Sequence, residues 1–210
     1  MSLDRRHGFI VSLSWIDVLT LGSLLLACAG LLAALHGRLT LAIALMLLAL
    51  LADMLDGALA RRTQRESEFG RYLDGFCDVI TYLLLPMFVL YQFGMQDPLS
   101  LAAFFVFISA GVLRLSRFNM VGVLAQADAL YYLGLPVFWS HLVVGLAFPV
   151  WRWQGHWARY PIVATLLVMS LYMIRNRRFR KPTRYARLAA LILSAAAVYL
   201  YLHAAGSLAP

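Results

Sequence analysis

The chain has 210 residues, of which 62% are hydrophobic and 13% charged, and its mean hydropathy is +0.77. This composition excludes an ordinary soluble domain, in which about a quarter of the residues are charged. The formal net charge is +8, but the basic residues flank apolar runs instead of forming a separate domain. That placement argues against nucleic-acid binding.

Long apolar segments follow one another along residues 15–208, which we expect to form a single transmembrane domain after a short cytoplasmic juxtamembrane segment, residues 1–14. Each segment approaches the roughly 20 residues that a helix needs to cross a bilayer. Because lipid admits only helices or closed barrels, we predict an all-α integral membrane protein, a bundle of six to seven transmembrane helices. The candidate spans are Trp15–Leu35, Leu39–Ala60, Tyr72–Tyr91, Leu99–Leu115, Tyr131–Val150, Tyr160–Ile174 and Arg187–Leu202.

The basic residues predict the orientation of these spans. With a cytoplasmic N-terminus, all of the 18 Lys and Arg residues except Arg38, Arg152 and Arg159 fall on the cytoplasmic side. Positive residues favour that side of a membrane. We therefore predict a multi-pass protein of the cell membrane with its N-terminus and its acidic motif facing the cytoplasm.

Four of the ten acidic residues are the aspartates of one motif, placed where the second and third spans meet the membrane surface. Asp53 and Asp56 are three residues apart and Asp74 and Asp78 four apart, so each pair lies on one face of a helix. Carboxylates at such a place are costly unless they hold cations. An all-oxygen site selects hard ions such as Mg²⁺ or Mn²⁺. A pair of such ions is typical of phosphoryl transfer, in which a carboxylate can also take a proton from the attacking hydroxyl.

Three alternatives involve the residues around these carboxylates. An ion-pair network with Arg61 or Arg71 is one, although four carboxylates exceed what one or two arginines neutralise. Gly57 and Gly70 allow a ligand to approach a helix backbone closely, but small residues also serve helix–helix packing. Arg61 suits a phosphate or, alternatively, simply follows the positive-inside rule.

The stretch from Asp53 to Asp78 resembles the signature of the CDP-alcohol phosphotransferases, D-x2-D-G-x2-A-R-x8-G-x3-D-x3-D. The resemblance implies a six-helix catalytic core, usually a homodimer, with the CDP group in a cytoplasm-facing cavity. It implies two divalent metal ions among the four aspartates and makes Asp78 the base. The residues implied to contact the CDP portion are Gly57, Ala60, Arg61 and Gly70.

One departure concerns the start of the first span. Many members of this family have Pro-Asn followed by Thr there, whereas this chain has Ile16 and Asp17 before Thr20. A carboxylate at position 17 would repel phosphate, although it could hydrogen-bond near the site. The alternative for Asp17 is a helix N-cap or a residue at the membrane interface.

A second resemblance concerns the acceptor alcohol. Leu113-Arg-Leu-Ser-Arg-Phe-Asn119, followed by Gly134-Leu-Pro136, resembles the phosphatidylserine synthase branch of the family. Arg114 and Arg117 are three residues apart and could receive an anionic group such as the carboxylate of serine. Their alternative role is topological, as the basic end of a span.

A competing pattern favours choline. Residues 133–140 also resemble a stretch of the bacterial phosphatidylcholine synthases. A quaternary ammonium group binds aromatic faces, which Tyr131, Tyr132 and Trp139 could supply. Ordinary packing is the alternative role of these three side chains.

The sequence thus predicts a metal-dependent phosphatidyltransferase that moves the phosphatidyl group of CDP-diacylglycerol to the hydroxyl of L-serine, giving phosphatidylserine and CMP. The same chemistry with choline, glycerol phosphate or inositol phosphate is the first alternative. A divalent-cation transporter would bind the same ions, although neither inverted repeats nor broken helices in matching halves are visible. A purely structural membrane role would make single aspartate substitutions silent.

Overall fold

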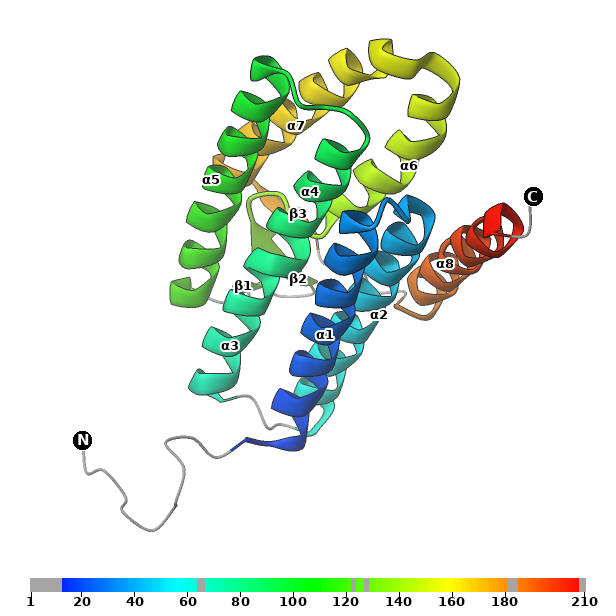
Figure 1. Cartoon of the computed structure of the whole chain (residues 1–210). Helices are drawn as coiled ribbons and strands as arrows, with labels where there is room; N and C mark the ends of the chain where they lie inside the picture. Colours follow the sequence, from blue (N-terminus) through cyan, green and yellow to red (C-terminus); the bar gives the residue numbers. More distant parts are fainter. Residues whose placement is uncertain (1–12, 64–66, 122–123, 127–128, 181–184, 208–210) are drawn as a thin grey trace, which may run out of the picture.

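Helices make up most of the protein, which was analysed as a computed structural model (Figure 1). The structure describes residues 13–63, 67–121, 124–126, 129–180 and 185–207. The elements in chain order are α1 (Trp15–Leu35), α2 (Leu39–Thr63), α3 (Glu68–Asp78), the π-helical turn η1 (Val79–Leu84), α4 (Leu85–Gln92), α5 (Pro98–Val121), β1 (Leu124–Gln126), β2 (Ala129–Leu133), α6 (Trp139–Gln154), the 3₁₀ turn η2 (Gly155–Ala158), α7 (Arg159–Ile174), β3 (Arg178–Arg180) and α8 (Tyr185–Ser207).

Six segments of the described chain are long and apolar enough to cross a membrane. They contain α1, α2, the continuous α3–η1–α4 unit, α5, the α6–η2–α7 unit and α8. The predicted fold class, an all-α integral membrane protein, is therefore confirmed. The juxtamembrane segment predicted for residues 1–14 lies almost entirely outside the described residues.

The fifth of these segments, Trp139–Ile174, is 36 residues long and folds back on itself. The strand before α6 pairs antiparallel with the strand after α7, so both ends of the segment lie at the same end of the molecule. Gly155, with a φ of 59°, begins the turn between the two legs. The two legs correspond to the two separate spans that the sequence predicts over this region.

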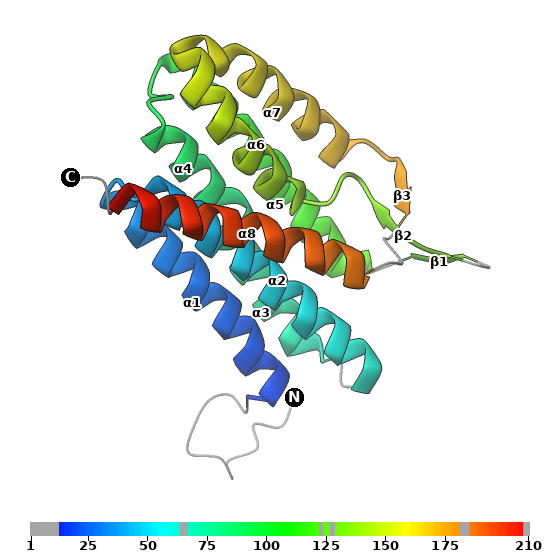
Figure 2. The same ribbon diagram turned by 90° about the vertical axis from the view of Figure 1, so that its right-hand side faces the viewer.

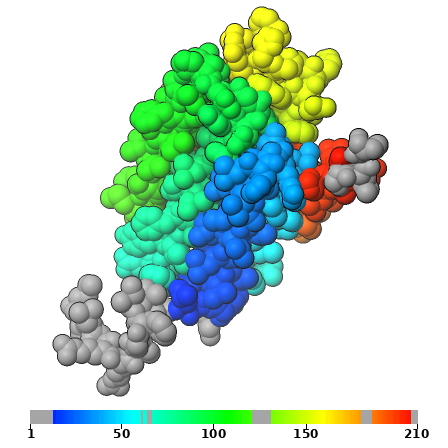
Figure 3. Space-filling view, in the orientation of Figure 1, coloured from blue at the N-terminus to red at the C-terminus, as the bar shows by residue number. Residues whose placement is uncertain are grey.

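The central element of the bundle is the α3–η1–α4 unit, which lies between α1 and α5 (Figure 1). Helix α2 packs against α1 and α8, and α5 packs against α7 (Figure 2). Figure 3 shows the side chains of α1, α3 and α5 covering one face of the molecule. The core gathers around η1 and α4, where the fully buried side chains include Ile43, Met46, Leu83, Leu85 and Phe107.

A small antiparallel sheet joins the end of α5 to the two-legged segment. Its strand order is β1-β2-β3, with Tyr131 opposite Leu124 in one pair and opposite Arg180 in the other. The prediction that the fifth span begins at Tyr131 is therefore wrong, because this residue lies in β2 and α6 begins only at Trp139.

Gly134 explains why the helix begins later. Its φ is 73°, a conformation that other L-residues rarely adopt. Its N–H donates to the Arg177 carbonyl at 2.8 Å, and a Cβ at this position would collide with the Met173 carbonyl. The Gly-Leu-Pro sequence is thus the corner at which β2 meets the end of α7.

Local capping fixes where the first and third helices begin. The Ser14 hydroxyl accepts the Asp17 N–H at 3.2 Å, and the Asp17 carboxylate accepts the Ser14 N–H at 2.7 Å. In this reciprocal capping box Ser14 is the N-cap and Asp17 is the third residue of the helix. Asp17 therefore stabilises the helix N-terminus, although not as the predicted N-cap. In the same way, the Ser67 hydroxyl accepts the Gly70 N–H at 2.8 Å, which starts α3 at Glu68, four residues before the predicted start of the third span.

Candidate active site and metal centre

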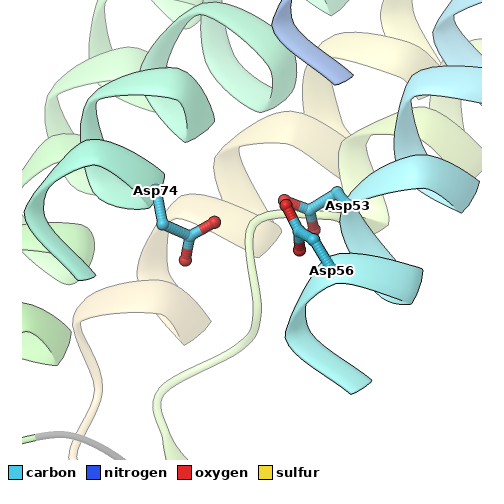
Figure 4. A group of neighbouring side chains, drawn as sticks. All are labelled: Asp53, Asp56 and Asp74. Carbon is cyan, nitrogen blue, oxygen red and sulfur yellow. The ribbon is translucent and has the colours of Figure 1, made fainter. Parts of the chain in front are cut away.

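Three of the four predicted aspartates converge between two helices. Helix α2 carries Asp53 and Asp56, and α3 carries Asp74, with the carboxylates turned toward one another across the gap (Figure 4). One carboxylate oxygen from each residue lies within 4.8 Å of the others. Asp56 is buried, whereas Asp53 and Asp74 are partly buried.

The electrostatics of this cluster favour a multivalent cation. Two ionised carboxylates about 5 Å apart repel each other by about 3 kcal/mol at an effective dielectric constant of about 20. Three such groups in one place need positive charge or protons to be stable. The oxygen-only donor set matches hard ions such as Mg²⁺ and Mn²⁺. The residues present therefore fit a divalent metal centre.

Asp78 lies one turn beyond Asp74, at the end of α3 and the start of the π-helical turn. It interacts electrostatically with Asp74 and Asp53 on one side and with Arg114 of α5 on the other. It is not among the three residues whose oxygens lie within 4.8 Å of one another. Asp78 therefore interacts both with the acidic cluster and with a buried cation.

The residues predicted to contact the CDP portion lie on the same two helices. Gly57 and Ala60 follow Asp56 on α2 and are partly buried. Gly70 lies in the first turn of α3, where an added Cβ would stand 3.1 Å from an Asp17 carboxylate oxygen. The glycine therefore also lets α1 approach α3. The side chain of Arg61 lies outside the part of the chain that the structure describes.

The two arginines predicted to bind the acceptor have different environments. Arg114 is 7% exposed, and its guanidinium carbon lies 5.2 Å from the centroid of the Phe118 ring and 5.9 Å from that of Tyr132. Its Nε atom has no hydrogen-bond partner within the described part of the chain. Arg117, by contrast, is exposed. Only Arg114 is buried beside the acidic cluster.

The aromatic residues considered for choline are also separated by the fold. Tyr132 lies in β2 beside Phe118 and Arg114. Trp139 is 42% exposed and stacks on Phe138, with 5.7 Å between ring centroids. Tyr132 therefore faces a cation that belongs to the protein itself.

Two residues near the site are not singled out by the sequence. The Tyr82 hydroxyl donates to Asp53 Oδ2 at 2.7 Å. The side chain of Asn119 covers Gly75, so closely that a Cβ there would collide with the Asn119 amide. The spacing of Tyr82, four residues after Asp78, and the presence of Asn119 in the Arg114 segment were the signals available for finding them.

The fold and the acidic cluster define a polytopic membrane protein with an oxygen-only site between its second and third spans. The family model described as CDP-alcohol phosphatidyltransferase matches residues 15–208. The chain therefore belongs to this family, which consists of membrane enzymes that use divalent metal ions.

Similar proteins include synthases with different acceptors. The chain is 31% identical over 192 residues to a phosphatidylcholine synthase of Agrobacterium fabrum, covering 88% of this chain and 74% of the relative. It is 32% identical to a phosphatidylcholine synthase of Rhizobium meliloti, covering 82% of this chain and 69% of the relative. It is 34% identical to a CDP-diacylglycerol–serine O-phosphatidyltransferase of Methanocaldococcus jannaschii over 93 residues, 44% of this chain and 43% of that relative.

Proposed function

We propose that the protein is a divalent-metal-dependent phosphatidyltransferase of the cell membrane that moves the phosphatidyl group of CDP-diacylglycerol to the hydroxyl of L-serine. The products are phosphatidylserine and CMP. The observation that carries this proposal is the convergence of Asp53, Asp56 and Asp74 in a chain of this family. The cationic loops favour a cytoplasmic position for this site, by the positive-inside rule.

The aspartates have two roles in the proposed reaction. Asp53, Asp56 and Asp74, with Asp78 at the edge, would hold two Mg²⁺ or Mn²⁺ ions. When bound, these ions neutralise the diphosphate oxygens and stabilise the leaving group. Gly57, Ala60, Arg61 and Gly70 border the CDP portion in this scheme, as the family signature implies.

Asp78 is the proposed base. It accepts the proton of the serine hydroxyl, and the serine oxygen forms a bond to the β-phosphorus. The bond from that phosphorus to the bridging oxygen breaks, and its electron pair leaves with CMP. A direct displacement suits this site, because its carboxylates suit metal binding and the described residues around it, the buried Cys77 included, offer no activated Ser or Cys nucleophile.

Arg114 supports serine as the acceptor. A buried guanidinium next to the proposed base favours a substrate with an anionic group, which serine has and choline lacks. The aromatic faces of Phe118 and Tyr132, which would attract a quaternary ammonium group, are in contact with Arg114. The exposed Arg117 is assigned a weaker role, steering the acceptor toward the cleft.

Choline is the second candidate, because the phosphatidylcholine synthases in the comparison cover more than four fifths of this chain. The homodimer implied by the family resemblance would apply to either acceptor. The reaction with either acceptor would use the same aspartates. The two acceptors differ in the charged group that they would bring near Arg114.

The deciding experiment supplies the purified protein with CDP-diacylglycerol, Mn²⁺ and one acceptor at a time: serine, choline, glycerol phosphate or inositol phosphate. We expect CMP release with serine and phosphatidylserine as the lipid product. Arg114→Gln should raise the KM for serine about tenfold or more, as expected for loss of a charge-assisted contact, while Arg117→Gln changes it less than threefold. Turnover with choline but not with serine would show that choline is the acceptor. Metal flux into liposomes without any CMP release would overturn the proposal that the protein is an enzyme.

A further inference from the structure

Tyr82 connects the acidic cluster to the centre of the bundle. Its side chain is 2% exposed, and its hydroxyl donates to Asp53 Oδ2 at 2.7 Å. Asp53 lies on α2, whereas Tyr82 lies in η1, immediately after the helix that carries Asp74 and Asp78. The hydrogen bond therefore joins the two helices that together form the proposed metal centre.

The π-helical turn determines where this tyrosine points. The Leu85 N–H donates to the Ile80 carbonyl, five residues earlier, so the turn is wider than an α-helical one. In an α-helix, a side chain four residues after Asp78 would be rotated by about 40° relative to it. Because a wider turn advances each residue by less than the roughly 100° of an α-helix, the π-helical turn rotates Tyr82 in the opposite sense. In this position its hydroxyl reaches Asp53 of α2. Such π-helical turns occur frequently at functional sites.

A second contact holds the tyrosine from the opposite side. The Ser140 hydroxyl donates to the Tyr82 carbonyl at 2.8 Å, and the Tyr82 ring packs on His141 with 4.7 Å between centroids. Ser140 and His141 are both fully buried in the first turn of α6. The tyrosine is thus fixed at its backbone and its ring, and only its hydroxyl reaches the acidic cluster.

We propose that Tyr82 is a positioning residue for the metal centre, holding the Asp53 carboxylate in the orientation in which its second oxygen faces Asp56 and Asp74. Hydrogen bonds to metal-binding carboxylates commonly change metal affinity by about 10-fold to 100-fold. The inference rests on the metal binding proposed above and adds a residue that the family signature does not contain.

The alternative is that Tyr82 is only a core residue whose hydroxyl happens to find an acceptor. The two views differ in what removal of the hydroxyl changes. A core role predicts lower thermal stability with unchanged metal affinity. A positioning role predicts weaker metal binding that excess metal overcomes.

The test compares Tyr82→Phe with Tyr199→Phe, a matched control. Tyr199 is also buried, and its hydroxyl donates to the Gly145 carbonyl, away from the aspartates. Mn²⁺ binding is measured on the full-length protein in detergent by loss of the free-ion paramagnetic resonance signal. We expect the Mn²⁺ dissociation constant to rise at least about tenfold in Tyr82→Phe and less than twofold in Tyr199→Phe. Turnover of Tyr82→Phe should return toward the wild-type value at saturating Mn²⁺.

An unchanged dissociation constant in folded Tyr82→Phe, with wild-type protein that does bind Mn²⁺, overturns the positioning role and leaves the proposed function intact. Wild-type protein that binds no Mn²⁺ overturns both. If Tyr82→Phe does not fold, Ser140→Ala decides, because it frees the tyrosine backbone and leaves its hydroxyl in place. We expect a smaller rise in the dissociation constant there, about threefold, and no rise would count against the inference.

Discussion

At one end of the bundle, Asp53, Asp56 and Asp74 point at one another from two helices, whereas at the other end Asp97 is held by its own neighbours. The Ser100 hydroxyl donates to Asp97 Oδ2 at 2.6 Å, and an Arg159 nitrogen lies 3.9 Å away. Asp97 thus caps the start of α5, and the protein itself supplies the hydrogen-bond donor and the nearby cation for its carboxylate. The clustered aspartates bring several carboxylates together, an arrangement that a cation or protonation stabilises. The contrast distinguishes a structural carboxylate from a ligand-binding one.

The sharpest test of this contrast is the same substitution at both ends. Asp74→Asn and Asp78→Asn should each lower turnover by roughly 10³-fold, the upper range for loss of one preorganised charged group. Asp97→Asn should retain more than half of the wild-type rate. CMP release under saturating Mn²⁺ measures all three, with thermal unfolding as the check on folding. Similar losses at both ends would mean that the carboxylates at the two ends do not differ in role.

A glycine-to-alanine pair tests how closely the site end is packed. A Cβ at Gly75 would collide with the Asn119 amide, whereas nothing lies within 4 Å of a Cβ at Gly22. Only the end of the Asn119 side chain needs to move, so we expect Gly75→Ala to fold. Its displaced amide next to Asp74 should lower turnover by roughly threefold to tenfold, a modest positioning effect. Gly22→Ala should be neutral in turnover, and equal losses in both variants would contradict the packing argument.

The smallest expected effect is the pH dependence of Asp97. The Ser100 hydroxyl first, and Arg159 to a lesser degree, lower the pKa of this carboxyl below its ordinary value. A lowered folded-state pKa contributes stability above the unfolded-state pKa, and this contribution is lost as the pH falls through the folded-state pKa. Thermal unfolding of wild type and Asp97→Asn should therefore differ slightly at about pH 7 and converge as the pH falls through the lowered folded-state pKa. A difference that persists at low pH would assign the effect to the hydrogen bonds alone.

The sequence alone predicts much of this molecule, because its strongest signals are local. Apolar runs of about 20 residues predict the helical membrane class, and the helical spacing of the aspartates predicts their shared faces. The structure confirms the class and places Asp53, Asp56 and Asp74 together. The prediction of where the fifth span begins was wrong, because Tyr131 lies in a strand. The turn that follows depends on the close approach of the Gly134 backbone to the Met173 carbonyl.

Contacts between distant residues were decided only by the tertiary structure. The sequence predicts the same role for Arg114 and Arg117. In the structure, Arg114 is buried against Phe118 and Tyr132, whereas Arg117 is exposed. Tyr82 becomes relevant only because its hydroxyl, in a π-helical turn, donates to Asp53, 29 residues earlier in the chain. Spacing along one helix follows from fixed backbone geometry, whereas the approach of two helices depends on side chains from the whole bundle.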